Sequence, residues 1–280
     1  MIPLERERSA QAVAAKYRGK GKHARDLELL QIQRDILRGT LTQHSFRAAF
    51  WKEAKTQLRK ESADKCAYCE ATTAIVAHGD VEHFRPKSVY WWLAYTYDNY
   101  LYACQICNQS YKNDAFPTAG PAPLAAPVVD AQATDADLQQ LVGRLSPDPL
   151  ATTAGYELTH YEQEHQREQA LLLNPYLDDP TQYFAYEADE VTQEVTLVAA
   201  HPAASAYVTA AEQYYGLNRV ELKTLRYKIY KAFRLLQRAL LAVPEADLRA
   251  DITQQLQEMQ AADYLFAGMN RYFARQSLSA

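Results

Sequence analysis

The 280-residue sequence predicts a mostly helical α+β protein with a small ββα core inside residues 63–117. All four cysteines lie in that stretch, in two C-x-x-C pairs. Between the pairs, the segment TAIVAHGDVEHF suggests two short strands around a Gly79-Asp80 turn. The segments on both sides repeat apolar residues with the helical period, so helices are expected to frame the core.

The cysteine spacing indicates a metal site. Cys66 and Cys69 form one pair, and Cys104 and Cys107 form the other. Two thiolate pairs that converge on one Zn²⁺ give a closed tetrahedral site, with Zn–S bonds of ~2.3 Å. Such a site is structural, so reactive groups must come from residues between and just after the pairs. The cysteines alone are equally compatible with a non-catalytic zinc ribbon or a rubredoxin-like iron site.

The composition is that of a soluble globular protein, with 48% hydrophobic and 23% charged residues. No apolar run reaches the ~18 residues that a membrane span needs, and the charged N-terminal segment is unlike a signal peptide. We therefore expect a cytoplasmic protein without a membrane partner. In that reducing compartment, paired cysteines favour a metal over disulfides.

Charge is unevenly distributed along the chain. Residues 1–60 carry 14 Lys/Arg and 6 Asp/Glu, whereas residues 118–210 carry 2 and 14. A basic N-terminal arm suits a phosphate backbone, although solvated helix faces explain the charge equally well. The acidic region would repel DNA, so we expect it to face a partner or solvent.

Residues 1–62 are expected to form a helical basic arm, with helices over 5–18, 24–38 and 43–61. The GKGKHAR stretch is expected to break the first two helices apart. After Pro86, the aromatic run from Tyr90 to Tyr102 is expected to pack the core against its helical frame rather than stack on unpaired bases.

Residues 118–280 are expected to form a mostly helical region that packs with the core as one unit and carries partner contacts. A Pro- and Ala-rich linker over 117–134 precedes an acidic helix over 156–170. Alternating residues predict a β-hairpin near 182–198. A final helix is expected over 246–275.

A long helix is expected before that final helix. Its core stripe repeats at steps of three and four, at Leu222, Leu225, Ile229, Phe233, Leu236 and Leu240. Basic residues share another side, with DNA, a partner or solvent as equal alternatives, at Arg219, Lys223, Arg226, Arg234 and Arg238.

The residues between and after the cysteine pairs suit phosphodiester hydrolysis. His83, with an ordinary pKa near ~6.5, can accept a proton from water, and it follows Glu82 on the expected second strand. Neighbours on a strand point to opposite faces. Glu82 and Asn108 offer oxygen donors, which Mg²⁺ prefers. Lys112 lies one helical turn beyond Asn108, where it can meet a phosphate.

This stretch resembles the HNH nucleases. Their ββα-metal motif consists of an acidic residue and His, a Pro three residues later, an Asn-Leu pair, a C-x-x-C pair and a final His or Asn. Here Glu82-His83, Pro86, Asn99 and Asn108 occupy those positions. The resemblance implies that His83 is the general base and that Glu82 and Asn108 bind one catalytic divalent cation. It also implies that Asn99 braces the loop by side-chain hydrogen bonds.

Two positions depart from the motif. Tyr100 replaces the usual Leu, which we interpret as a packing change. Asn108 replaces the more common His, which favours a hard cation such as Mg²⁺, with Mn²⁺ also possible. Beside the proposed base, Arg85, Lys87 and Lys112 are candidate contacts to phosphate. For Arg85 and Lys87, a solvated loop is the equal alternative.

The similarity extends over roughly residues 60–240 with gaps. The segments EHFRPKS, CQICNQSYK, LLLNPYLDDP and GLNR are similar to bacterial HNH proteins that act beside an ATPase in Septu-type antiphage defence and in some retron systems. This resemblance implies a DNA-cleaving effector with an ATPase subunit as partner. The alternative is a non-catalytic zinc-binding adaptor that links nucleic acid to that ATPase. Both contain zinc, so only activity separates them.

Overall fold

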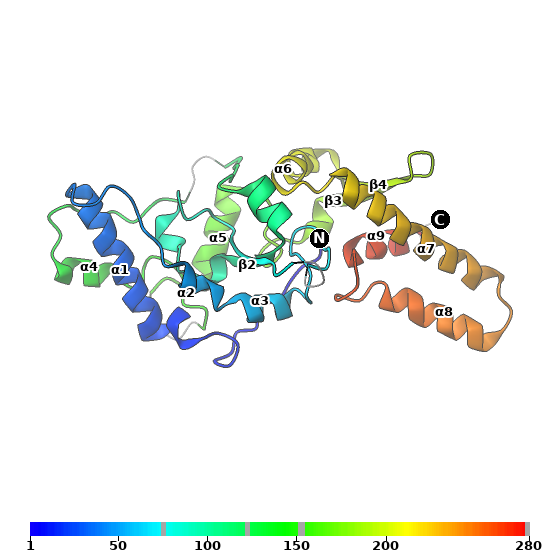
Figure 1. Cartoon of the computed structure of the whole chain (residues 1–280), viewed down its shortest axis with the longest axis horizontal. Helices are drawn as coiled ribbons and strands as arrows, with labels where there is room; N and C mark the ends of the chain where they lie inside the picture. Colours follow the sequence, from blue (N-terminus) through cyan, green and yellow to red (C-terminus); the bar gives the residue numbers. More distant parts are fainter. Residues whose placement is uncertain (74–76, 121–123, 151–154, 278–280) are drawn as a thin grey trace.

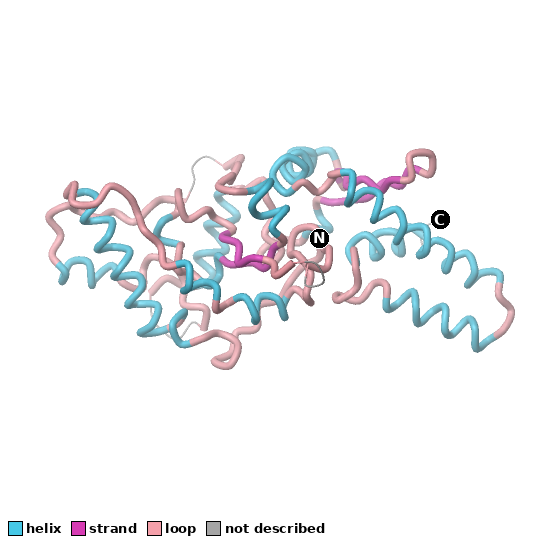
Figure 2. The backbone as a smooth tube through the Cα atoms, viewed as in Figure 1, coloured by secondary structure: helices cyan, strands magenta, loops and turns pink. Residues whose placement is uncertain are grey.

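The computed structural model describes residues 1–73, 77–120, 124–150 and 155–277. The chain is α+β, about half of it is helical, and the strands within these residues form two small antiparallel pairs. Figure 1 shows an elongated molecule, with α1 and α4 at one end and the α7–α8 pair extending from the other. Figure 2 shows that long loops connect the elements in the middle. The expected α+β class is confirmed.

Helices form most of the regular structure. The α-helices of the described residues are α1 (Gly19–Leu37), α2 (Ala48–Lys52), α3 (Lys55–Glu61), α4 (Asp135–Leu141), α5 (Leu158–Glu168), α6 (Ser205–Tyr215), α7 (Val220–Ala242), α8 (Ala246–Glu258) and α9 (Ala267–Ser277). A π-helical turn spans Ile106–Lys112, and short 3-10 turns include Trp91–Leu93 and Tyr97–Asn99. Within the described part of the chain, no helix combines the length and apolar character needed to cross a membrane.

The helix expected over residues 5–18 is wrong. The chain has no helix before a 3-10 turn at Ala15–Tyr17, and the GKGKHAR stretch starts α1 instead of breaking it. Without helical coiling, Arg6 reaches both Glu61 and the Tyr100 carbonyl. The backbone N–H of Leu4 donates to the Pro175 carbonyl at 2.8 Å. These contacts to distant segments stabilise the non-helical path over the local helical tendency.

Strand β1 (Asp80–His83) pairs antiparallel with β2 (Tyr100–Ala103), with His83 opposite Tyr100. The hairpin expected around Gly79-Asp80 stays a prediction. Asp80 starts β1, and the described partner of β1 is β2, which lies beyond the loop 84–99. The other expected strand includes residues 74–76, which lie outside the described residues. Every residue of β2 is buried, so its pairing with β1 lies inside the protein.

Strands β3 (Phe184–Asp189) and β4 (Glu194–Ala199) confirm the hairpin expected near 182–198. The turn between α6 and α7 fixes this hairpin. The Asn218 side chain accepts a hydrogen bond from the Leu197 N–H and donates one to the Leu197 carbonyl, both at 2.9 Å. Gly216 ends α6 with a φ of +62° against the Tyr111 ring, where a Cβ atom would lie 2.5 Å from the ring.

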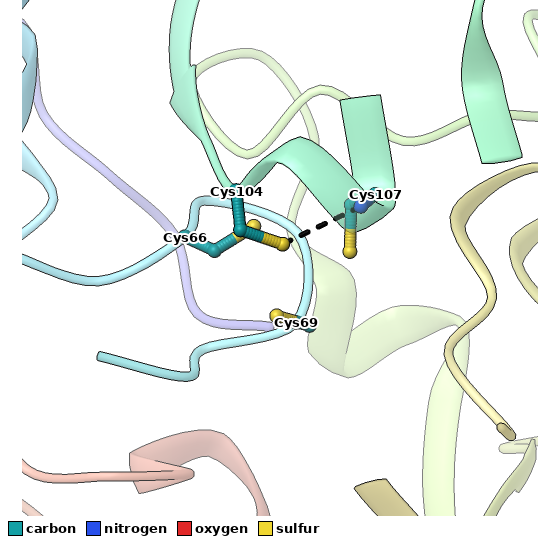
Figure 3. A group of neighbouring side chains, drawn as sticks. All are labelled: Cys66, Cys69, Cys104 and Cys107. Atoms are coloured by element: carbon teal, nitrogen blue, oxygen red, sulfur yellow. Dashed lines mark hydrogen bonds between the residues drawn. The ribbon is translucent and has the colours of Figure 1, made fainter. Parts of the chain in front are cut away.

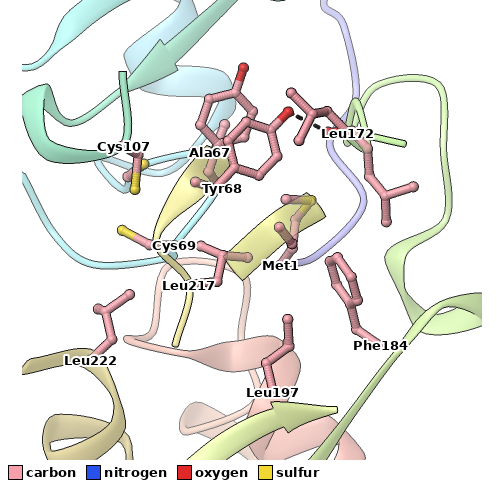
Figure 4. Close-up of a cluster of buried hydrophobic side chains, with 14 of the residues drawn as sticks. Met1, Ala67, Tyr68, Cys69, Cys107, Leu172, Phe184, Leu197, Leu217 and Leu222 are labelled. Atoms are coloured by element: carbon pink, nitrogen blue, oxygen red, sulfur yellow. Dashed lines mark hydrogen bonds between the residues drawn. The ribbon is translucent and has the colours of Figure 1, made fainter. Parts of the chain in front are cut away.

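The main core surrounds the cysteines and draws on all three expected segments. Figure 4 shows Met1, Tyr68 and Leu172 gathered beside Cys69 and Cys107, with residues from β3, β4 and α7 opposite them. The rings of Tyr68 and Tyr215 stack with their centroids 3.8 Å apart. Segments 1–62, 63–117 and 118–280 therefore share one packed interior, although the boundaries drawn between them stay a prediction.

The single helix expected over 246–275 is wrong, because the chain turns between α8 and α9. Phe266 takes a φ of +53°, which a continuing helix does not allow. The turn is held by Asn270, whose amide donates to the Met259 carbonyl at 2.6 Å, and by Lys65, which donates to the Tyr264 carbonyl at 2.8 Å. The core stripe of α7 is largely confirmed, but Leu225 is 37% exposed.

We predict that Asn218→Ala lowers the free energy of unfolding by about 2 kcal/mol, because two backbone groups of Leu197 lose their partner. Urea unfolding followed by circular dichroism measures this as a lower midpoint with an unchanged slope. The control Gln213→Ala changes an exposed residue of α6 and should leave the midpoint in place. Equal midpoints for both variants would contradict the role of Asn218.

Candidate metal centre and active site

The four cysteine side chains converge, as their spacing predicts. Figure 3 shows Cys66 and Cys69 on one loop facing Cys104 and Cys107, which lie at the end of β2 and in the π-helical turn. All four Sγ atoms lie within 4.8 Å of one another. A tetrahedral Zn²⁺ with ~2.3 Å bonds needs S–S separations of about 3.8 Å, so the cluster can close on one ion with small adjustments.

The surroundings of the cysteines suit a bound cation. Burial raises the pKa of the Cys66 thiol, so a thiolate at this position needs a positive charge beside it. The Cys107 N–H donates to the Cys104 Sγ at 3.4 Å, and the Arg219 Nη1 donates to the Cys107 Sγ at 3.6 Å. These donors offset the excess negative charge of four thiolates around one divalent ion. The donor set fits a structural zinc site.

His83 ends β1 and is 6% exposed. Its Nε2 lies 3.0 Å from the Ala94 carbonyl, and its ring meets those of Trp51 and Tyr100 edge to face at 4.8 and 5.1 Å. A carbonyl only accepts, so Nε2 carries the proton and Nδ1 keeps its lone pair. Burial, aided by Lys87 and Lys112, lowers the pKa of His83 to about 3. The ring is thus a neutral base at neutral pH.

Asn99 holds the loop that follows His83. Its Oδ1 accepts from the Arg85 N–H at 2.9 Å, and its Nδ2 donates to the Arg85 carbonyl at 2.9 Å. The same Nδ2 reaches the Leu93 carbonyl at 3.4 Å. Asn99 is completely buried, so it acts on the backbone behind the site rather than on a substrate. This arrangement matches the bracing role that the resemblance implies.

The oxygen donors lie on the face of β1 that meets the π-helical turn. Asn108 donates to the Asp80 carboxylate at 3.1 Å, and Gln109 donates to the same oxygen at 2.8 Å. Glu82 lies two residues beyond Asp80, so their carboxylates share one face of the strand. Asp80 was not among the site residues predicted from the sequence. The alternation in D-V-E, which places Asp80 and Glu82 on the same face of a strand, is the signal that could have identified it.

Glu82 is already paired with a cation of the protein. The Lys112 ammonium lies 2.5 Å from Glu82 Oε1 and donates to the His83 carbonyl at 3.0 Å. Burial raises the pKa of the Glu82 carboxyl, while Lys112 acts in the opposite direction. Lys112 therefore supplies part of the positive charge that this buried carboxylate requires.

A pocket of about 200 Å³ lies at this candidate site. Glu82, His83 and Asn108 line it together with Lys87, whose Nζ lies 5.5 Å from the centre of the Trp51 ring. The structure thus brings together the expected base, the two expected cation ligands and one candidate phosphate contact. Further lining residues are Trp51, Val81, Pro86, Gln109, Asn113 and Asp114.

The expectation that Arg85 and Lys112 contact phosphate disagrees with their burial, because both side chains are completely enclosed. The Arg85 Nε donates to Glu168 at 2.8 Å, and the Tyr90 hydroxyl donates to the other Glu168 oxygen at 2.6 Å. Arg85 therefore connects the loop that follows His83 to α5 through this ion pair. The aromatic run containing Tyr90 is buried, in agreement with the packing interpretation.

No protein-family model matches the chain, and no solved structure matches it. The sequence is similar to Septu protein PtuB of Bacillus mycoides (strain KBAB4). The two are 26% identical over 207 residues, which cover 69% of this chain and 56% of that protein. The chain thus spans little more than half the length of this curated relative.

We predict that the purified protein contains one zinc ion per chain and that Cys66→Ala loses it. Because metal binding and folding are coupled, the variant should melt well below the wild type. Elemental analysis and a thermal melt measure the two effects. A strong chelator should lower the melting temperature of the wild type but not that of Cys66→Ala. A wild-type melt that the chelator leaves unchanged would contradict the structural role of the metal.

We predict that Glu168→Ala costs about 3–5 kcal/mol of unfolding free energy, because Arg85 is left buried without its counter-charge. Denaturant unfolding measures the loss. The control Glu162→Gln alters an exposed glutamate on the same helix and should change stability by less than about 0.5 kcal/mol. If the two variants proved equally stable, the ion pair between Arg85 and Glu168 would not contribute to stability.

Proposed function

We propose that this protein is a metal-dependent endonuclease of the HNH type that hydrolyses phosphodiester bonds in DNA. The observation that carries the proposal is the pocket in which neutral His83, with its Nε2 proton held by Ala94, stands beside Glu82 and Asn108. A base, two oxygen donors and a small polar pocket are the parts that metal-assisted hydrolysis of a phosphodiester requires.

His83 is the proposed general base. Because Ala94 fixes the proton on Nε2, the lone pair on Nδ1 can take a proton from a water molecule that attacks phosphorus. No hydrogen bond within the described residues engages Nδ1. The rings of Trp51 and Tyr100 pack edge to face against the imidazole, so the base does not have to be ordered when substrate arrives.

Glu82 and Asn108 are the proposed ligands of Mg²⁺ or Mn²⁺, and Asp80 is placed to support them. Their donor atoms are carboxylate and amide oxygens, which fit a hard cation that keeps several waters. When bound, such an ion would neutralise charge on the phosphate and on the leaving oxygen. Lys87, partly exposed at the pocket, is the remaining candidate for direct phosphate contact.

A role in antiphage defence is proposed from two supports. One is the similarity to Septu protein PtuB, and the other is the resemblance of the segments around the site to HNH proteins of Septu-type systems. The ATPase subunit expected beside such proteins is part of the same proposal. The segment LLLNPYLDDP, which carries part of the resemblance, packs into the core through Leu172 and Leu173.

One observation favours the alternative of a non-catalytic zinc adaptor. Lys112 lies where it already neutralises Glu82, which is the arrangement of a site that has no need of a second cation. Cleavage activity decides between the two functions, because the adaptor would bind nucleic acid without cutting it.

We predict that the protein cleaves DNA with Mg²⁺ or Mn²⁺ and that His83→Ala lowers the rate by about 10²–10⁴-fold, the usual contribution of a general base. The measurement is nicking of supercoiled plasmid, with metals varied and with the proposed ATPase partner added. The control His201→Ala removes an exposed histidine distant from the pocket in sequence and should cut at the wild-type rate. Equal rates for wild type and His83→Ala would refute the assignment of the base.

A further inference from the structure

A second cavity lies in the C-terminal part of the protein, between α7, α9 and β3. Its volume is about 410 Å³, within the range of about 300–1,000 Å³ that is typical of small-ligand sites. We call it the α7–α9 groove. It is lined by Tyr186, Tyr230, Arg234, Gln237, Arg238, Leu241, Tyr272, Phe273 and Gln276. None of these described lining residues is acidic, and none belongs to the His83 pocket.

The structure divides the basic residues of α7 into two sets, apart from Arg234, which donates to Gln237 at 2.9 Å. From Leu222 to Ala242 the helix has six Lys/Arg and no Asp/Glu. Lys223 pairs with Glu194 at 2.6 Å, and buried Arg226 donates to the Leu217 carbonyl at 2.7 Å. Lys223 and Arg226 therefore bind groups of the protein itself, as Arg219 does at the Cys107 Sγ. The single basic face expected from Arg219 to Arg238 is therefore corrected.

The second set faces outward. Lys228, Lys231 and Arg238 are exposed, and no hydrogen bond or ion pair joins their side chains to another residue that the structure describes. Lys231 and Arg238 are seven residues apart, which is about 10 Å along the helix.

The rings of the groove share its lining with Arg238, and Lys231 lies two turns before Arg238 on the same side of α7. The centroids of Tyr230 and Phe273 are 4.5 Å apart, and those of Phe273 and Tyr272 are 5.3 Å apart. All three side chains are half-buried, so each keeps accessible ring surface, whereas Tyr186 is buried beneath them. Accessible rings next to unpaired cations are the surface that base stacking and phosphate neutralisation require together.

We propose that the α7–α9 groove binds single-stranded nucleic acid, with bases against Tyr272 and Phe273 and phosphates at Lys231 and Arg238. An acidic protein would satisfy the cations but make little use of the rings. The proposal rests on the proposed function, since it names a second site for the same substrate. Because α7 extends away from the cysteine-centred body (Figure 1), the groove holds a strand apart from the point of cleavage.

The test measures binding without cleavage. His83→Ala is placed in every protein, EDTA is present, and fluorescence anisotropy follows a labelled 20-nucleotide single strand as DNA and as RNA. The test variant is Lys231→Glu with Arg238→Glu. The control is Lys20→Glu with Arg144→Glu, which makes the same charge change at two other exposed residues. A further variant, Tyr272→Leu, is compared on the strand and on its abasic counterpart.

The variant Lys231→Glu with Arg238→Glu is expected to bind the strand at least ~10-fold more weakly than the control. The slope of log affinity against log salt concentration should shrink by about 1.4, because two phosphate contacts are lost. Tyr272→Leu should weaken binding of the normal strand and leave the abasic strand unchanged. The DNA and RNA arms show which strand is preferred. Equal affinities of the groove and control variants would overturn the proposal and leave the surface for an acidic protein.

That outcome is distinguishable from failure of the proposed function. Binding is measured with the base removed and without metal, so it does not depend on cleavage. A wild-type protein that binds through the groove but cuts nothing would refute the nuclease assignment alone.

Discussion

The centre of this protein is a cluster of four cysteine side chains, whose Sγ atoms lie within 4.8 Å of one another inside the main core. A two-stranded sheet is at best marginally stable in water, and β1–β2 has only four residues in each strand. The two cysteine segments hold that sheet through contacts beyond its strand pairing. Cys104 directly follows β2, and the Ala67 N–H between the first two cysteines donates to the Tyr102 carbonyl at 2.9 Å. Glu82 and His83 lie on β1, opposite Leu101 and Tyr100 of the strand that leads into Cys104.

Two buried ion pairs also position the elements around the site. Lys112 with Glu82 and Arg85 with Glu168 are both enclosed pairs, and each joins elements far apart in the sequence. Enclosed pairs add little net stability, because desolvation offsets their attraction, but an unmatched partner is costly. They therefore act mainly by excluding other arrangements. The loop after His83 can dock on α5 only where Arg85 meets Glu168.

The sequence allowed some of these features to be predicted and not others, for physical reasons. Cysteine spacing and the Glu82-His83 pair are local signals, so the cluster and the composition of the pocket could be anticipated. The partner of Arg85 could not, because Glu168 lies 83 positions away and nothing local marks it. Residues 5–18 have helical periodicity, but contacts of Arg6 and Leu4 with three distant segments override it. For Lys112, charge suggested exposure, whereas Glu82 draws it inside.

The loop from 84 to 99 has a consequence for how the protein can change. Ala94, which orients the His83 ring, and Asn99, which holds Arg85, belong to the same loop, whose aromatic residues pack against α1 and α5. The packing of this loop and the orientation of His83 are therefore linked. Under the proposed function, substitutions that loosen the packing would displace the imidazole, so heat tolerance and turnover would change together.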